Sequence, residues 1–381
     1  MLDLLKTAIQ TVFRLFPFPT RTGLRAIGQP GSESPVFVTC NFDLTVRRVV
    51  KALQGLDCYL LVADSRGINV WCAAGGGILN AHSVISVLKT SRIAEKVNHR
   101  TLILPQLSAP GIDVARVQRE TGWHCKFGPV YAKDIPAYIA GNFKKTEAMR
   151  RAEFPLGQRL EMTVMWAGML SFFVGIPVAI FSLKTLPGVL ALLWGFALFL
   201  FVFYDPVMRY VPGPVGIVQT FVLGLVGVAG VIAWGLGIGN WQIGHIAGWS
   251  LSILAVALVL GFDLDGNSPL RAGSTTAYWS HRWPGILDLW AKIGYDLEPY
   301  FTLQVETERC NGCKTCMEVC PKEVFELTRL NGKQKSRVAA MDACEQCTAC
   351  VKQCPSNAIL ADPPIKGFVR AGGNHSGDIR N

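Results

Sequence analysis

Hydrophobic and polar positions alternate between strand-like and helix-like patterns from residue 35 to residue 138. Short apolar runs predict buried strands at 36–40, 58–63, 101–105 and, more weakly, 123–128. Between the strands, apolar residues recur at helical spacing over 44–53, 81–89, 114–121 and 134–139. Strands that alternate with helices in this way are typical of a parallel α/β sheet. We therefore expect a Rossmann-like α/β domain over residues 31–143.

The first 30 residues follow a different pattern. Leu4, Leu5, Ala8, Val12 and Phe16 recur at helical spacing, which predicts a short amphipathic helix. The charges of Asp3, Lys6 and Arg14 interrupt the apolar pattern, so the segment does not resemble a signal peptide. The helix is equally compatible with a position on the membrane surface and with packing on the protein.

Four long apolar segments follow a basic linker at 144–161. They span 163–183, 186–204, 215–239 and 243–262, and each has the length of a bilayer core without Lys, Arg, Asp or Glu. Lysine and arginine are concentrated before the first segment and after the fourth, so we expect a four-helix transmembrane domain over 162–262 in the cell (inner) membrane, with both soluble domains in the cytoplasm. His245 lies near one end of the fourth segment, where a headgroup position is the simpler interpretation.

Residues 263–300 form an expected interfacial linker, in which Trp279, Trp283 and Trp290 are compatible with a membrane anchor or with packing on a neighbouring domain. The last residues, 364–381, are polar and glycine-rich, and we expect them to be disordered.

Composition agrees with a membrane protein. The chain has 381 residues, of which 50% are hydrophobic, a mean hydropathy of +0.31 and a formal net charge of +10. Its basic stretches do not interleave with aromatic residues, so the charge favours a membrane with basic cytoplasmic flanks, and we expect no nucleic-acid partner. Eight of the twelve cysteines fall in two short runs, which indicates metal binding in a reducing compartment.

The two cysteine runs are the most specific signal in the chain. They read CNGCKTCMEVCP at 310–321 and CEQCTACVKQCP at 344–355. Each is the C-x2-C-x2-C-x3-C-P run of bacterial two-cluster ferredoxins, in which the fourth cysteine of a run binds the other cluster. We therefore expect an α+β ferredoxin domain over 301–363, and a structural zinc site is the weaker alternative. One [4Fe-4S] cluster takes Cys310, Cys313, Cys316 and Cys354, and the other takes Cys344, Cys347, Cys350 and Cys320.

A lone cysteine in the α/β domain raises a separate question. Cys72 lies in GINVWCAAGGG at 67–77, directly after the predicted strand at 58–63. An isolated cysteine is usually a small buried hydrophobe, which is the expectation for Cys40, Cys58 and Cys125. Ligands in α/β folds, however, bind at the carboxyl ends of the strands, which is where this segment falls.

The α/β region contains NVWCAAG at 69–75 and the stretches ESPVFVTCNF, LLVADSRGINVWCAAG, HRTLILPQLSAPGI and FGPVYAKDIPAYI. Through these residues it resembles the corrinoid protein of microbial mercury methylation. The C-terminal part resembles that protein's two-cluster ferredoxin partner, so the chain looks like a fusion of the two. The resemblance implies a cobalamin-type cofactor with Cys72 as the lower axial ligand of cobalt and as the catalytic residue. The cap that holds the cofactor would be Asn69, Val70, Trp71, Cys72, Ala73, Ala74 and Gly75.

The resemblance implies a membrane-anchored corrinoid-dependent methyltransferase whose cobalt is reduced by the ferredoxin domain. Its partners would be membrane lipid, a methyl-donor protein or methylated folate-type donor, and an upstream electron donor. Two departures concern the acceptor: Gly76 replaces the family's lysine, and the C-terminal tail has no cysteine pair. The acceptor is therefore left unassigned, and Hg(II) is an alternative. A second alternative is a membrane electron-transfer ferredoxin without corrinoid, and a transporter is a weaker one because the spans lack internal polar residues.

Overall fold

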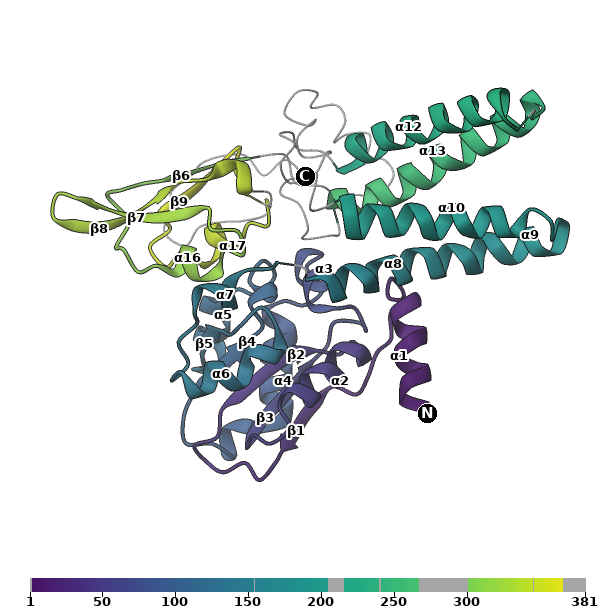
Figure 1. The fold of residues 1–381 in the computed structure, drawn as a ribbon. Coiled ribbons are helices and arrows are strands. Elements are labelled where there is room, and N and C mark those ends of the chain that lie inside the picture. The colour runs from purple at the N-terminus through teal and green to yellow at the C-terminus, as the bar shows by residue number, and fades with distance from the viewer. Residues whose placement is uncertain are drawn as a thin grey trace, which may run out of the picture.

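The computed structural model describes residues 2–153, 155–204, 216–239, 241–266, 301–344 and 346–365. Figure 1 shows an α/β domain, a set of long apolar helices and a small C-terminal domain that lies over one end of the α/β domain. The tryptophans expected to form an anchor (Trp279, Trp283 and Trp290) and the tail from residue 366 lie outside the described residues.

The α/β domain is built on a five-stranded sheet in the order β1-β3-β2-β4-β5. Four strands are parallel, and each was predicted from its apolar run: β2 (Val36–Cys40), β3 (Cys58–Ala63), β4 (Thr101–Leu104) and β5 (His124–Phe127). β2 pairs with β3 on one side and with β4 on the other, so the order in which successive parallel strands are added changes side at β2. Such a switch point is where α/β sheets bind ligands.

Helices cover both faces of this sheet. One face carries α2 (Asp43–Ala52) and α6 (Ile135–Ala140), which pack on Phe37, Leu60 and Ile103. The opposite face carries α4 (Ala81–Ser91) and α5 (Val114–Thr121). Because successive strand residues point to opposite faces, burial on both sides explains the continuous apolar runs of β2 and β3.

The structure differs from the predicted all-parallel sheet at its edge. β1 (Gly23–Ile27) pairs antiparallel with β3, in the register Gly23 to Val62 and Ile27 to Cys58. The sheet is therefore mixed, and it includes residues that we had assigned to the N-terminal segment before residue 31. β1 is only partly buried, so its sequence lacks the apolar run that identified the other strands.

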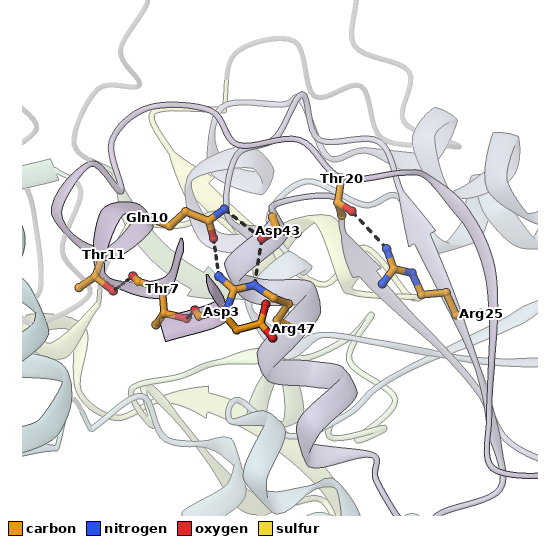
Figure 2. A network of polar contacts seen from close by, with 8 residues as sticks. All are labelled: Asp3, Thr7, Gln10, Thr11, Thr20, Arg25, Asp43 and Arg47. Atoms are coloured by element: carbon orange, nitrogen blue, oxygen red, sulfur yellow. Dashed lines mark hydrogen bonds and ion pairs between the residues drawn. The ribbon is translucent and has the colours of Figure 1, made fainter. Parts of the chain in front are cut away.

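The N-terminal helix α1 (Leu2–Val12) packs on the protein. Arg47 of α2 donates hydrogen bonds to Thr7 Oγ1 (2.6 Å), Gln10 Oε1 (2.7 Å) and Asp43 Oδ2 (2.9 Å), as Figure 2 shows. Gln10 is buried, and its amide also donates to Asp43. The opposite face of α1 leaves Leu4 and Leu5 exposed.

Four helical segments are long and apolar enough to cross a membrane: Leu156–Phe181, Leu186–Phe203, Thr220–Gly237 and Ile243–Gly261. They agree with the four predicted spans. The first contains α8 (Leu156–Leu170), a π-helical turn (Ser171–Gly175) and α9 (Ile176–Phe181), and the second contains α10 (Leu186–Leu198). The last two are α12 (Gly216–Gly237) and α13 (Ile243–Gly266), which pack closely where Gly224 faces Ala257. His245 lies exposed in the first turn of α13.

The C-terminal domain has the two short sheets and two short helices expected of an α+β ferredoxin. β6 (Thr302–Val305) pairs with β9 (Ile359–Asp362), and β7 (Phe325–Leu330) pairs with β8 (Lys333–Val338), both antiparallel. Helix α16 (Thr315–Val319) lies within the first cysteine run, and α17 (Ala349–Gln353) lies within the second.

Candidate corrinoid pocket and iron–sulfur sites

Cys72 lies on a short helix whose first turn is capped by the side chain of Asn69. The helix α3 (Val70–Gly75) begins after Asn69, whose Oδ1 accepts a hydrogen bond from Cys72 N at 3.0 Å. The same amide donates from Nδ2 to Cys72 Sγ at 3.3 Å. Asn69 therefore caps the helix and also orients the sulfur atom of Cys72.

A cavity of about 280 Å³ lies beside this helix, at the carboxyl ends of β2 and β4. The sheet contributes Thr39 and Leu104, and the loop after β4 contributes Pro105 and Leu107. Of the seven predicted cap residues, four line the cavity: Asn69, Val70, Trp71 and Cys72. The other three are placed elsewhere, because Ala73 and Ala74 are buried in the core and Gly75 is exposed.

The sequence did not indicate two other parts of the cavity wall. Gln158, Met162 and Met165 reach it from α8, the start of the first apolar segment, and Arg14 and Leu15 reach it from the turn after α1. Arg48 also lines the cavity, and its guanidinium donates to Glu161 of α8 at 2.8 Å. The pocket is therefore formed jointly by the α/β domain and the apolar helices, through contacts far apart in the sequence.

The cavity wall has a polar group that suits a ligand with amide side chains. Thr39 is 1% exposed, and its Oγ1 finds no hydrogen-bond partner within the described part of the chain. A bound ligand can thus satisfy a buried hydroxyl.

The remaining cysteines of the α/β domain have the core role that was expected of them. Cys40 and Cys58 are buried in the sheet, and Cys125 packs against the same core. Burial raises the pKa of Cys58 to about 11 and that of Cys125 to about 12, and it also raises the pKa of Cys40. These three thiols are inert at neutral pH.

The second predicted cysteine set surrounds a small cavity in the ferredoxin domain. Cys320, Cys344, Cys347 and Cys350 all line a space of about 20 Å³. The pKa of the Cys350 thiol is raised, first by burial and then by the neighbouring Cys347, Cys344 and Cys320. The structure therefore brings together the four thiols that the spacing assigned to one cluster.

The first predicted set is linked through Ser336 of β8. Ser336 N donates to Cys310 Sγ at 3.3 Å, and its hydroxyl lies 3.2 Å from Cys316 Sγ. Burial raises the pKa of Cys316 to about 11, with smaller contributions from Cys313 and Cys354. In the described ranges, no three His, Cys, Asp or Glu side chains lie close enough to hold a single metal ion.

The ferredoxin domain contacts the α/β domain through several polar bonds. Gln353 of α17 is 5% exposed, and its Nε2 donates to Ala109 O (2.8 Å) and Ile112 O (2.6 Å). Lys145 Nζ donates to Gln106 Oε1 (2.6 Å) and to Glu318 O (3.0 Å), which joins the two domains a second time. A third link is the ion pair between Arg151 and Glu323 at 2.8 Å.

Comparison with known proteins supports this division. Residues 5–139 match the family described as the CO dehydrogenase/acetyl-CoA synthase delta subunit, and residues 309–360 match the 4Fe-4S dicluster domain. The chain is 36% identical over 133 residues to the acetyl-CoA decarbonylase/synthase complex subunit gamma of Archaeoglobus fulgidus. It is 30% identical over 128 residues to the corrinoid/iron-sulfur protein large subunit of Moorella thermoacetica.

These matches are local. They cover 34% and 33% of this chain, and the chain spans only 28% of the length of either relative. The matched part contains the whole five-stranded sheet and Cys72, and the second match contains all eight cysteines of the two runs. Residues 5–139 are therefore similar to a domain of the corrinoid/iron–sulfur proteins, and residues 309–360 of the same chain are similar to the 4Fe-4S dicluster domain.

Proposed function

We propose that the chain is a membrane-anchored corrinoid methyl carrier with its own electron supply. One observation carries the proposal: Cys72, on a helix capped by Asn69, lines a cavity at the carboxyl ends of the parallel strands. The corrinoid/iron–sulfur domain match supports the cofactor class. The dicluster match supports iron–sulfur electron transfer to it.

In this proposal the chain's residues have distinct tasks. A bound corrinoid supplies a cobalt ion that accepts and donates a methyl group. The thiolate of Cys72 is a soft, electron-donating ligand for that ion, and Asn69 holds its sulfur toward the cavity. Ala73 and Ala74 anchor the helix in the core, and Thr39 offers a hydroxyl to an amide of the macrocycle.

The eight cysteines of the ferredoxin domain hold two [4Fe-4S] clusters. The enclosed space among Cys320, Cys344, Cys347 and Cys350 supports the second ligand set, and the bridge through Ser336 supports the first. A [4Fe-4S] cluster held by such thiolates would carry single electrons at low potential. Such a potential suits the reduction of a corrinoid cobalt.

The four apolar helices support a position of the pocket at a membrane. Met162 and Met165 of α8 line the cavity and also belong to the first apolar segment, so the pocket adjoins the bilayer surface. We propose that both soluble domains lie on the cytoplasmic side of the cell membrane. The partners are a methyl-donor protein or a methylated folate-type donor and an upstream electron donor.

Metal content and one spectrum test the proposal. Protein purified without oxygen from cells that make corrinoid should contain about one Co and about eight Fe per chain. Cys72→Ala should lose the absorption of thiolate-ligated cobalt and retain the iron. Cys125→Ala, which removes a core thiol outside the cavity, should keep both metals. Iron without cobalt in the unaltered protein would instead favour a membrane electron-transfer ferredoxin.

The methyl acceptor is a separate part of the proposal. The resemblance to the mercury-methylation corrinoid protein makes Hg(II) one candidate, although Gly76 stands where that family has lysine. The methylated protein, once its cobalt content is established, is incubated with Hg(II) without oxygen. Formation of methylmercury assigns the acceptor, and its absence from cobalt-loaded protein excludes Hg(II).

A further inference from the structure

A single loop separates the candidate corrinoid pocket from the ferredoxin domain. It connects β4 to α5 and runs from Pro105 to Asp113. At its start, Pro105 and Leu107 line the cavity that Cys72 also lines. A few residues later, Ala109 is fully buried within the hydrophobic core of the ferredoxin domain. The same short segment therefore forms part of both sites.

The middle of this loop lies directly against the helix that carries Cys72. A Cβ placed on Gly111 would lie 2.7 Å from Ala74 O and 2.8 Å from Ala74 Cα, and it would also meet Leu79 O. Only glycine permits this approach. Gly111 thus brings the loop backbone into contact with α3, two residues beyond Cys72.

The other side of the loop is held by the residues that precede Cys354. Lys352 Nζ donates to Pro110 O at 3.0 Å, and the buried amide of Gln353 donates to the carbonyl oxygens of Ala109 and Ile112. Gln353 is bonded covalently to Cys354, whose sulfur accepts a hydrogen bond from Ala358 N at 3.2 Å. The ligand set that includes Cys354 therefore lies next to the loop.

We propose that the cluster held by Cys310, Cys313, Cys316 and Cys354 is the one that passes electrons to the corrinoid, and that Gln353 is the positioning residue that fixes it to the loop at 109–112. The inference rests on the proposed function and goes beyond it by assigning the order of the clusters. The cluster held by Cys320, Cys344, Cys347 and Cys350 then receives electrons first.

The electron balance of this step is simple. A low-potential one-electron donor, dithionite in the test, reduces the clusters. One electron then leaves the reduced cluster, which returns to its 2+ state, and cobalt gains that electron and changes from Co(II) to Co(I). No atom or proton moves between the domains. Because tunnelling slows steeply with distance, a close and fixed contact at the loop determines the rate.

Gln353→Leu tests the positioning role, with Gln304→Leu as the matched control. Both replace a glutamine of the ferredoxin domain by a residue of similar size, but Gln304 is exposed on β6. In full-length protein that holds iron but no corrinoid, hydrogen exchange of the amides at 109–112 should rise in Gln353→Leu and stay unchanged in Gln304→Leu. This readout is independent of cobalt.

The second readout is the rate of cobalt reduction in cobalt-loaded protein after the clusters are reduced. Gln353→Leu should slow it by about tenfold, because the loss of these hydrogen bonds lowers the docked population by about that factor, while iron content remains at the unaltered level. Lys352→Met, which removes the partly buried bond to Pro110 O and leaves the buried amide of Gln353 in place, should show a smaller decrease. This milder variant keeps the test decisive if Gln353→Leu fails to fold.

The third readout assigns the cluster. Ser336→Ala removes the hydroxyl beside Cys316 and therefore shifts the electron paramagnetic resonance signal of the first set only. In cobalt-loaded protein, nearby Co(II) should broaden the same signal that Ser336→Ala shifts. Broadening of the other signal, or an unchanged reduction rate in Gln353→Leu despite faster exchange at 109–112, would overturn the inference. Absence of cobalt from the unaltered protein would overturn the proposed function itself.

Discussion

The side-chain amide of Asn69 contacts Cys72 twice. Its oxygen accepts from the backbone N of Cys72 at 3.0 Å, and its nitrogen donates to the sulfur at 3.3 Å. One residue thereby sets both the start of α3 and the direction of the thiol. Substitutions that separate these two contacts can show which of them the pocket needs.

Asn69→Asp should keep the helix cap and damage the sulfur site. Aspartate caps helices as well as asparagine does, so the free energy of unfolding should change by less than about 0.5 kcal/mol. The new carboxylate, however, repels a thiolate and offers it no donor. We expect the fraction of thiolate-ligated cobalt to fall by about tenfold, since a lost charge-assisted hydrogen bond costs about 1.5–3 kcal/mol.

Absorption spectra of cobalt-loaded protein measure that fraction, and Asn69→Ala provides the comparison. Alanine removes both contacts, so this variant should also lose about 1 kcal/mol of stability. Equal cobalt ligation in Asn69→Asp and in the unaltered protein would show that the 3.3 Å contact with the sulfur has no influence on the ligand.

Gly111→Ala should push the loop away from α3. The new methyl group would lie 2.7 Å from Ala74 O, and because that atom is backbone, the helix must move. We expect a loss of about 1–3 kcal/mol in the free energy of unfolding, the usual cost of overpacking. Corrinoid retention should fall as well. Gly31→Ala is the control, because a Cβ there meets nothing within 4 Å, and denaturant unfolding measures both.

Much of the fold follows from local patterns in the sequence. The buried runs of β2, β3 and β4 and the four apolar helices were found because each repeats one type of residue over its whole length. The cysteine spacing likewise predicted which thiols meet around the small cavity. These patterns involve residues that are close together in the sequence, so they can be recognised without knowledge of tertiary contacts.

The parts that the sequence did not predict depend on long-range packing. β1 is a half-exposed edge strand that is defined by its pairing with β3. Met162 and Met165 are apolar, like most residues of a membrane-spanning helix, so their sequence does not distinguish them. They line the pocket because α8 packs beside it. The same is true of Gln353, because nothing in its own segment indicates two acceptors at 109 and 112.

Arg47→Met should detach the N-terminal helix. It removes two hydrogen bonds from α2 to Thr7 and Gln10 of α1 and the bond to Asp43 within α2, and it leaves Gln10 and Asp43 without their cation (Figure 2). We expect α1 to become about tenfold more sensitive to protease, since bonds to charged groups contribute about 1.5–3 kcal/mol. Corrinoid should also dissociate faster, because the turn after α1 carries Arg14 and Leu15 into the cavity wall.

The control for this experiment is Arg25→Met. Arg25 is another arginine near the N-terminus, and within the described part of the chain its side chain donates to Thr20 Oγ1 at 3.3 Å, away from Arg47. Its replacement should leave both the cleavage rate and corrinoid dissociation unchanged. Equal cleavage in the two variants would show that Arg47 does not hold α1 in place.

The turn after α1 should contact lipid. Phe13 and Phe16 pack against Phe172 and Phe173 of the first apolar segment, with ring centroids of Phe13 and Phe172 5.2 Å apart. Phe16 and Phe173 are about half exposed, at 46% and 53%, which favours a bilayer around them. A photo-crosslinking amino acid at Phe16 should label lipid in nanodiscs. The same probe at Leu330, which is equally exposed on β7, should not label lipid.

Alkaline pH should strengthen the contact between the two soluble domains. Lys145 lies half-buried between them, and burial lowers its pKa from 10.5 to about 8. When the domains separate, water restores the ordinary pKa, so the docked state disfavours the ammonium form. The penalty is therefore complete below pH 8 and declines as pH rises from about 8 toward 10.5.

Denaturant titrations of the full-length protein at pH 7 and pH 9.5 measure this effect, with domain separation followed by near-UV circular dichroism. The midpoint for separation should be higher at pH 9.5. Lys145→Met places an uncharged side chain of similar length at the interface, so its midpoint should vary less between the two pH values. Lys144→Met, which changes the exposed neighbouring lysine, should retain the original pH dependence. If Lys145→Met also retains it, another group at the interface must titrate in this range, and the two hydrogen bonds of Lys145 to Gln106 and Glu318 do not control docking.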